Sequence, residues 1–191
     1  MEIAMMLTGI GGQGVQLLAT TLAEAATSEG RDVMLLGTYG GVMRGGNTDS
    51  TLVIADNPVS SPPMLSKVGV GIAMHHEFWV PLEKKLCPGA VVVVNDTVFV
   101  GDITDKDVKI YRIPATKIAN DLGSPMCGAM VLLGAYAKLS GIVKLESLIT
   151  AMTASLPSYR QQHIEANTEA LTVGFDSVKA DTSPVWSEQS G

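Results

Sequence analysis

Cysteine and charge are scarce in this sequence, and each scarcity excludes a class of protein. The two cysteines, Cys87 and Cys127, lie far apart and outside any C-x-x-C pair, so the ligands of an iron–sulfur cluster or a zinc ribbon are missing. Charged residues make up 17% of the chain, against about 25% in an average soluble domain. The net charge of −6 has the wrong sign for a protein that follows phosphates, so we expect no nucleic-acid partner.

No apolar run in the sequence is long enough to cross a bilayer. The longest, Ala129 to Leu145, contains Lys138, Ser140 and Lys144, whereas a spanning helix needs about 20 nearly uncharged residues. The first apolar run follows no cationic segment, and glycines stand where a signal cleavage site would lie. We therefore expect a cytoplasmic protein without a membrane partner.

Apolar residues are abundant instead, at 46% of 191 positions, which excludes disorder and suits one folded domain. We expect a single domain over residues 1–179 and a flexible polar tail over residues 180–191. A domain of this size cannot bury all of its apolar surface alone, and the remainder is available to another chain. The composition therefore suits a subunit.

Apolar runs typical of buried strands alternate with amphipathic helical segments along the chain. Strands are expected at residues 2–7, 33–36, 51–55, 68–73, 90–94 and 108–113. Helices are expected at residues 15–29, 77–86, 115–122, 125–139 and 145–156, and from about residue 160. This alternation predicts an α/β fold with a mainly parallel, Rossmann-like sheet, helices on both faces and a helical C-terminal third.

A Gly9-x-Gly11-x-x-Gly14 pattern follows the first expected strand and opens the first helix. Glycines there let the backbone approach a pyrophosphate at the positive end of the helix dipole. A nicotinamide-binding unit would also carry Asp or Glu at the end of the second strand, where this chain has Gly37-Thr38-Tyr39. NAD is therefore disfavoured, while phosphate contact and simple packing of a tight turn both remain open.

Arg44 lies in a loop from Tyr39 to Asn47 that contains four glycines, and it is the only cation between Asp32 and Lys67. A guanidinium in such a loop can form paired hydrogen bonds to a phosphate or a carboxylate. A surface ion pair with Asp49 is the alternative, and it would contribute little. The residues leave both interpretations open.

The remaining polar motifs do not indicate catalysis. His75-His76-Glu77 follows a strand, but neighbouring side chains point in different directions and no third metal ligand is apparent. We expect these residues to begin a helix or to contact a partner. His163, Glu165 and Asn167 are expected to be solvated or capping groups, and no nucleophile has a visible base. We expect no catalytic residue and no metal ligand in this chain.

Two glycine-rich segments in order, GIGGQGV at Gly9–Val15 and YGGVMRGG at Tyr39–Gly46, resemble the gamma subunit of the 2-oxoacid:ferredoxin (acceptor) oxidoreductases. This is the family of the pyruvate, 2-oxoglutarate and ketoisovalerate oxidoreductases. Residues 128–135 are similar to the family's Met-x-x-Leu-Gly helix, and Asn167 with Gly174 is similar to its closing segment. The resemblance covers nearly the whole chain.

This resemblance implies a non-catalytic subunit of an enzyme that oxidatively decarboxylates a 2-oxoacid to an acyl-coenzyme A. Its partners would be alpha and beta subunits, with or without a delta subunit, and ferredoxin indirectly. Thiamine diphosphate, magnesium and iron–sulfur clusters would reside on those partners, which agrees with the absence here of a G-D-G motif followed by N-N. We favour 2-oxoglutarate as the substrate, although substrate choice would lie mainly on the thiamine-bearing chains.

The resemblance also implies that this chain contacts coenzyme A. The residues expected to line that site are Gly11, Gly12, Gln13 and Gly14. The loop expected to face the catalytic subunits contains Tyr39, Gly40, Met43, Arg44, Gly45 and Gly46. Expressed alone, the chain is expected to hide its apolar surface in a homodimer. A stand-alone dinucleotide-binding dehydrogenase and a nucleotide-sensing module are the alternatives.

Overall fold

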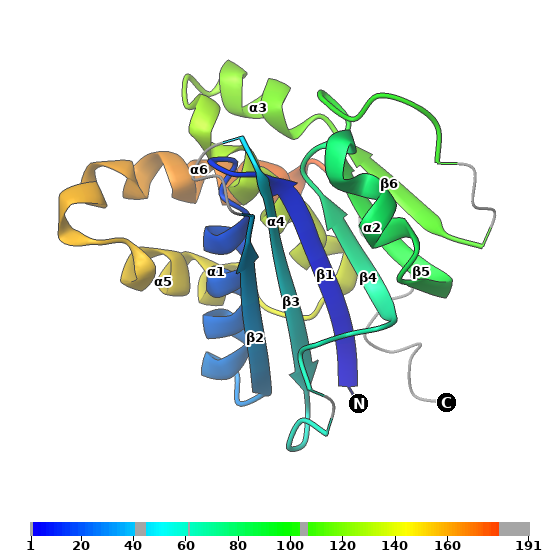
Figure 1. Cartoon of the computed structure of the whole chain (residues 1–191). Coiled ribbons are helices and arrows are strands. Elements are labelled where there is room, and N and C mark those ends of the chain that lie inside the picture. Colours follow the sequence, from blue (N-terminus) through cyan, green and yellow to red (C-terminus); the bar gives the residue numbers. More distant parts are fainter. Residues whose placement is uncertain (1, 41–44, 61, 104–106, 180–191) are drawn as a thin grey trace.

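A six-stranded sheet forms the centre of the protein (Figure 1). The computed structural model describes residues 2–40, 45–60, 62–103 and 107–179, so the expected tail over residues 180–191 lies outside the described part. The strands are ordered β2-β3-β1-β4-β5-β6. Their bounds are Glu2–Ile10 (β1), Asp32–Tyr39 (β2), Asn47–Ala55 (β3), Val68–Ala73 (β4), Leu86–Asn95 (β5) and Lys109–Ile113 (β6).

The sheet is mainly parallel, as predicted, but β3 runs against both of its neighbours, β1 and β2. This antiparallel strand separates β2 from β1 and places β2 at the edge of the sheet. We expected a buried strand there, and that prediction is wrong. Met34, Leu35 and Leu36 of β2 are 41%, 37% and 39% exposed, because no further strand or helix covers this edge within the described residues.

Helices cover both faces of the sheet unequally (Figure 1). On one face, α1 (Val15–Ser28), α4 (Gly128–Ser140), α5 (Leu145–Ser155) and α6 (Ile164–Asp176) enclose the larger core. On the other, the 3-10 helix η1 (His76–Phe78) and α2 (Trp79–Glu83) cover a smaller core. Alternating side chains of β1 enter the two cores, with Met5 in the larger and Met6 in the smaller.

Three further segments lie beyond the sheet: α3 (Ala115–Asp121), η2 (Pro125–Cys127) and η3 (Ser158–His163). The last of these leads directly into α6. None of the helices in the described residues is both long and apolar enough to span a membrane.

A pair of glycines sets the distance between α4 and α6. A side chain at Gly134 would overlap the carbonyl oxygen of Leu171, and one at Gly174 would overlap the carbonyl oxygen of Val131. The two helices can therefore meet backbone to backbone only because both positions lack a Cβ atom. This contact fixes α6, and with it the segment that precedes α6, against the rest of the domain.

Pro88-Gly89, which precedes the strand expected at residues 90–94, lies inside β5. Gly89 has a φ of +78°, and the pairing of β4 with β5 shifts register between Val68 and Val70. Such an irregularity lets a strand pass through a proline and a left-handed glycine without ending. The strand is consequently longer than the 90–94 that its apolar run predicts.

Candidate functional site

A glycine turn joins the carboxyl end of β1 to the first residue of α1. Gly12 and Gly14 have φ values of +104° and +84°, a region that residues with a side chain rarely adopt. The backbone N–H of Gln13 donates to the carbonyl oxygen of Ile10 at 3.0 Å. In return, Gln13 Oε1 accepts from the Ile10 N–H at 2.8 Å. Gln13 thus holds the turn in shape from within.

The N-terminus of α1 points unpaired donors out of this turn. Gly14 caps the helix without a side chain, and the first helical bond runs from the Leu18 N–H to the Gly14 carbonyl oxygen at 2.9 Å. Within the described chain, the N–H groups of Val15, Gln16 and Leu17 have no hydrogen-bond acceptor. Together with the helix dipole, such groups form a binding site for an anion.

The described end of the second glycine-rich segment lies beside the first segment, because β3 begins next to the end of β1. The N–H of Gly11 donates to the Gly46 carbonyl oxygen at 2.8 Å, and the N–H of Gly40 donates to the Asn47 carbonyl oxygen at 2.8 Å. Gly45 has a φ of +80°. Tyr39 ends β2. The structure thus brings the described ends of this loop to the glycine turn, while Met43 and Arg44 lie outside the described residues.

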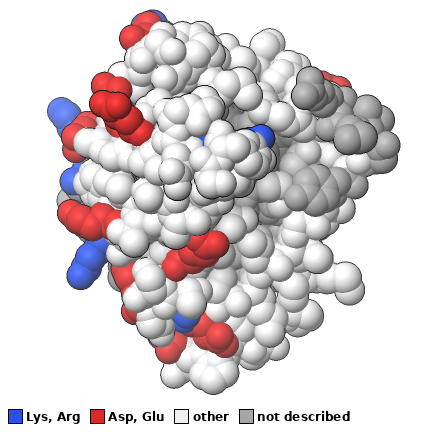
Figure 2. Space-filling view, turned by 90° about the vertical axis from the view of Figure 1, so that its left-hand side faces the viewer, with Lys and Arg blue, Asp and Glu red and all other residues white. Residues whose placement is uncertain are grey.

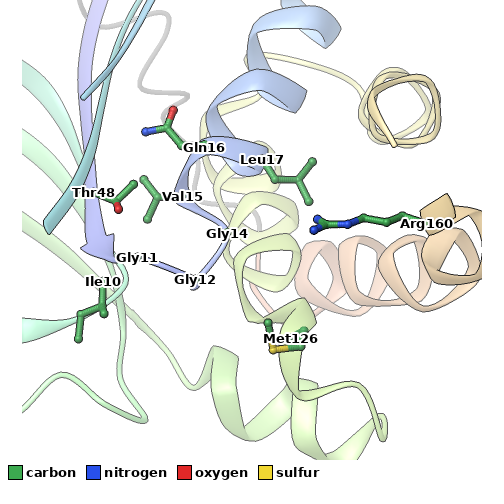
Figure 3. A pocket seen from close by; sticks show the side chains of 10 residues that line it. All are labelled: Ile10, Gly11, Gly12, Gly14, Val15, Gln16, Leu17, Thr48, Met126 and Arg160. Carbon is green, nitrogen blue, oxygen red and sulfur yellow. The ribbon is translucent and has the colours of Figure 1, made fainter. Parts of the chain in front are cut away.

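A pocket of about 630 Å³ opens at the glycine turn (Figure 3). Its size falls within the range of about 300–1,000 Å³ found for small-molecule sites. It is lined by Ile10, Gly11, Gly12, Gly14, Val15, Gln16, Leu17, Thr48, Met126 and Arg160. Three of the four expected turn residues line it, whereas Gln13, Gly40, Gly45 and Gly46 do not.

Sequence reasoning missed the wall opposite the turn. A second pocket of about 330 Å³ adjoins the first, and it is lined by Gly12, Gly14, Leu17, Met126, Cys127, Leu156, Arg160, His163 and Asn167. We expected Asn167 to be solvated or capping, but it is buried, with 7% of its surface exposed. Arg160 comes from η3, far along the chain, and no local pattern marks it as a neighbour of the turn.

His75 caps a helix, and the Cys127 thiol is not activated as a nucleophile. His75 Nδ1 accepts the Glu77 N–H at 3.2 Å and caps η1, so the predicted helix start is confirmed. Burial and the neighbouring His76 hold the pKa of His75 below its ordinary value. Burial raises the pKa of the Cys127 thiol. The raised pKa disfavours the thiolate, which is the form of cysteine that acts as a nucleophile. The described part of the chain contains no cluster of three His, Cys, Asp or Glu residues that could hold a metal ion.

The strand order argues against a dinucleotide site of the nicotinamide type. In such a site, an acid at the end of the second strand reaches a ribose bound at the first strand's glycine turn. Here β3 separates β2 from β1, and β2 ends in Thr38-Tyr39 without an acid. One intervening strand adds roughly 4.8 Å to that distance.

Comparison with known proteins agrees with this geometry. The family described as pyruvate ferredoxin/flavodoxin oxidoreductase matches residues 4–177. The 2-oxoglutarate synthase subunit KorC of Methanocaldococcus jannaschii is 31% identical over 176 residues, which are 91% of this chain and 92% of that one.

Two solved structures share the fold. The gamma subunit of a keto/oxoacid ferredoxin oxidoreductase from Geobacter sulfurreducens is 26% identical with a TM-score of 0.78, over 92% of this chain and 95% of that chain. A 2-oxoglutarate:ferredoxin oxidoreductase from Magnetococcus marinus, solved with 2-oxoglutarate, coenzyme A and succinyl-CoA bound, is 21% identical with a TM-score of 0.82. That match covers 94% of this chain and 32% of the larger chain. The chain therefore belongs to the pyruvate ferredoxin/flavodoxin oxidoreductase family, as a gamma subunit of a 2-oxoacid:ferredoxin oxidoreductase.

Proposed function

We propose that this gamma subunit binds coenzyme A at the glycine turn and presents it to thiamine-bearing partner subunits. The observation that carries the proposal is the unpaired N-terminus of α1, which opens into the 630 Å³ pocket through Gly12 and Gly14. Coenzyme A carries phosphates, which are the anions that such a helix terminus and glycine turn accommodate. The loop that contains Arg44 ends beside the pocket, where Gly46 accepts a hydrogen bond from Gly11, and Arg44 is proposed to add a guanidinium to the site.

The redox and decarboxylation chemistry is assigned to the partners. Cys87 is partly exposed and Cys127 is buried, and the two are not joined, so these thiols do not fit a cluster that needs four cysteine ligands. Bound on other chains, thiamine diphosphate would supply the carbon–carbon bond cleavage and the iron–sulfur clusters would carry the electrons. This chain would hold the acyl acceptor, and its residues would orient the phosphates.

The partner surface is proposed to include β2. Met34 and Leu36 alternate with Leu35 along a strand whose outer edge has no partner within the described residues. Figure 2 shows charged side chains gathered in one half of the molecule's side view, whereas the described residues of the other half show few of them. Alpha and beta subunits would cover this surface in the complex, and a second copy would cover it when the chain is alone.

The proposed substrate is 2-oxoglutarate. A relative named as the 2-oxoglutarate synthase subunit KorC matches over nearly the full length of both chains, which supports this proposal. The proposed location is the cytoplasm.

Purification from the native host tests this assignment directly. An affinity-tagged chain is expected to bring down thiamine-dependent subunits, and the complex is expected to reduce a viologen dye with 2-oxoglutarate only when coenzyme A is added. The chain alone is expected to be inactive. Turnover by the isolated chain, or isolation without a thiamine-binding partner, would contradict the proposal.

A further inference from the structure

The two pockets at the glycine turn meet at Arg160. They share Gly12, Gly14, Leu17, Met126 and Arg160, so they form adjoining compartments rather than separate sites. One wall comes from the turn and the start of α1. The opposite wall comes from η3 and the first turn of α6, which the glycine contact between α4 and α6 holds in place.

The side-chain amide of Asn167 faces the smaller compartment. Asn167 is 7% exposed, it lines the 330 Å³ pocket, and its amide has no hydrogen bond to any described residue. Its nitrogen and oxygen are not among the fully enclosed side-chain atoms of the described residues that lack a partner, so they are open to a molecule in the pocket. A polar group from outside the chain is therefore expected against Asn167.

Arg160 is a cation without a counter-ion. No carboxylate among the described residues lies within ion-pair distance of its guanidinium, and its ring contact is with the adjacent Tyr159 at 5.5 Å. In Figure 3 the guanidinium reaches toward Gly14 and Leu17. It thus faces the positive end of α1. Two positive groups that converge on one pocket without a neutralising acid are complementary to an anion between them.

We infer that Arg160 and Asn167 form the second half of the ligand site, with Arg160 clamping a phosphate against the start of α1 and Asn167 hydrogen-bonding a nucleobase edge. An amide side chain can pair with both a ring nitrogen and the exocyclic amino group of adenine. The walls beside Asn167 include Leu17, Met126 and Leu156, which suit a flat apolar ring. This inference rests on the proposed coenzyme A contact and names the residues that read the adenosine-phosphate end.

Calorimetric titration of the assembled complex separates the two contacts. The probes are coenzyme A, adenosine 3′,5′-diphosphate, pyrophosphate and pantetheine. Arg160→Met is expected to weaken binding of the three phosphate-bearing probes by about 10- to 100-fold, which is the loss of one or two charge-assisted hydrogen bonds. Asn167→Leu is expected to weaken coenzyme A and adenosine 3′,5′-diphosphate about tenfold while pyrophosphate binds as before. Pantetheine is expected to respond to neither change.

Lys67→Met is the matched control, because it removes one exposed positive charge at the opposite end of β4 from the turn. Circular dichroism and melting establish that each variant folds. Asn167→Asp, which keeps the size of the side chain, replaces Asn167→Leu if the latter does not fold. Hydrogen exchange is expected to show that coenzyme A protects residues 158–167 in the wild-type complex.

Each outcome decides between the two proposals. If wild-type complex binds coenzyme A and both site variants bind it as Lys67→Met does, Arg160 and Asn167 are not ligands, while the coenzyme A proposal stands. If wild-type complex binds neither coenzyme A nor pyrophosphate, both proposals fall. If Arg160→Met weakens the binding of pantetheine as much as the binding of pyrophosphate, Arg160 has a structural role. That result would overturn its part of the inference.

Discussion

Gly12 has a φ of +104°, where an added side chain strains the backbone, yet the space around its Cα is open. Gly12→Ala is therefore expected to lower the free energy of unfolding by about 1–2 kcal/mol through backbone strain alone. Because the new methyl group would project from the turn itself, coenzyme A affinity should also fall, which titration of the complex would measure.

Gly101 provides the matched control for this prediction. Its φ is +106°, and it too has no neighbouring atom within 4 Å of an added Cβ. Gly101→Ala should cost a similar free energy of unfolding and leave coenzyme A affinity unchanged. Equal loss of affinity in both variants would mean that strain, rather than position at the turn, is responsible.

Tyr136 is fully buried, and its hydroxyl has no hydrogen-bond partner in the described residues. Burial raises the pKa of Tyr136 above its ordinary value of about 10. The folded chain therefore keeps this proton at a pH where the unfolded chain loses it, so stability falls as the pH rises above about 10. Below that pH the effect is absent.

Tyr136→Phe removes both the unpaired hydroxyl and its titration. At neutral pH the variant should be as stable as the wild type or up to about 1 kcal/mol more stable. Above pH 10 its advantage should grow by about 1.4 kcal/mol per pH unit, as urea unfolding at several pH values would show. A difference that stays constant from pH 8 to about pH 11.5 would contradict this assignment.

Single residues of the site were predictable only where the chemistry is local. The glycine turn could be located because the pattern, the strand before it and the helix after it are contiguous. Arg160 and Asn167 reach the same pocket through the packing of α6 on α4, which depends on two glycines at Gly134 and Gly174. No sequence pattern near Arg160 predicts the packing of α6 on α4.

At the scale of elements, the crossing of α4 and α6 depends on Gly174. An added Cβ atom would overlap the Val131 carbonyl oxygen, which is backbone and cannot rotate away. Gly174→Ala should therefore push the helices apart and lower the free energy of unfolding by about 3 kcal/mol, at the upper end of ordinary overpacking. Thermal or urea unfolding measures this loss.

Gly128 tests whether the loss comes from the crossing. It also lies in α4, but the nearest atom to an added Cβ is 3.8 Å away. Gly128→Ala should leave stability unchanged or raise it by about 0.5 kcal/mol, since alanine favours a helix more than glycine does. A comparable loss in both variants would show that the crossing is not the cause.

The elements themselves were largely predictable, and the sheet order was not. Periodicity identifies β4 at its observed bounds and α1 to within one residue, because both are regular and apolar on the buried side. The apolar run of β2 has the same sequence pattern whether the protein core or a partner chain covers it. The pattern therefore predicts a buried strand where the chain alone leaves the side chains partly exposed. The reversed direction of β3 depends on pairing between distant residues, which periodicity does not encode.

For the whole molecule, the exposed apolar strand β2 predicts association. Leu36→Lys places a charge at the proposed subunit surface on a side chain that is 39% exposed. Because that side chain adds little to the core, the free energy of unfolding should change by less than about 1 kcal/mol. Sedimentation velocity should show loss of the proposed homodimer, and partner subunits should be recovered in smaller yield.

Val100→Lys is the control, since Val100 is 74% exposed and lies outside β2. It should dimerise and assemble as the wild type does. If Leu36→Lys leaves the dimer intact, or if Val100→Lys disrupts the dimer equally, the subunit surface lies elsewhere.

The order in which the ribosome makes this chain also matters, because the two walls of the pocket lie at opposite ends of the sequence. Residues 11–14 emerge early, whereas residues 160–167 emerge only after the strands and most of the helices have been made. A nascent chain can therefore close its glycine turn long before the pocket has a second wall. If coenzyme A binds at the proposed site, its capture would wait until α6 docks on α4, so a growing chain would not sequester it before the fold is complete.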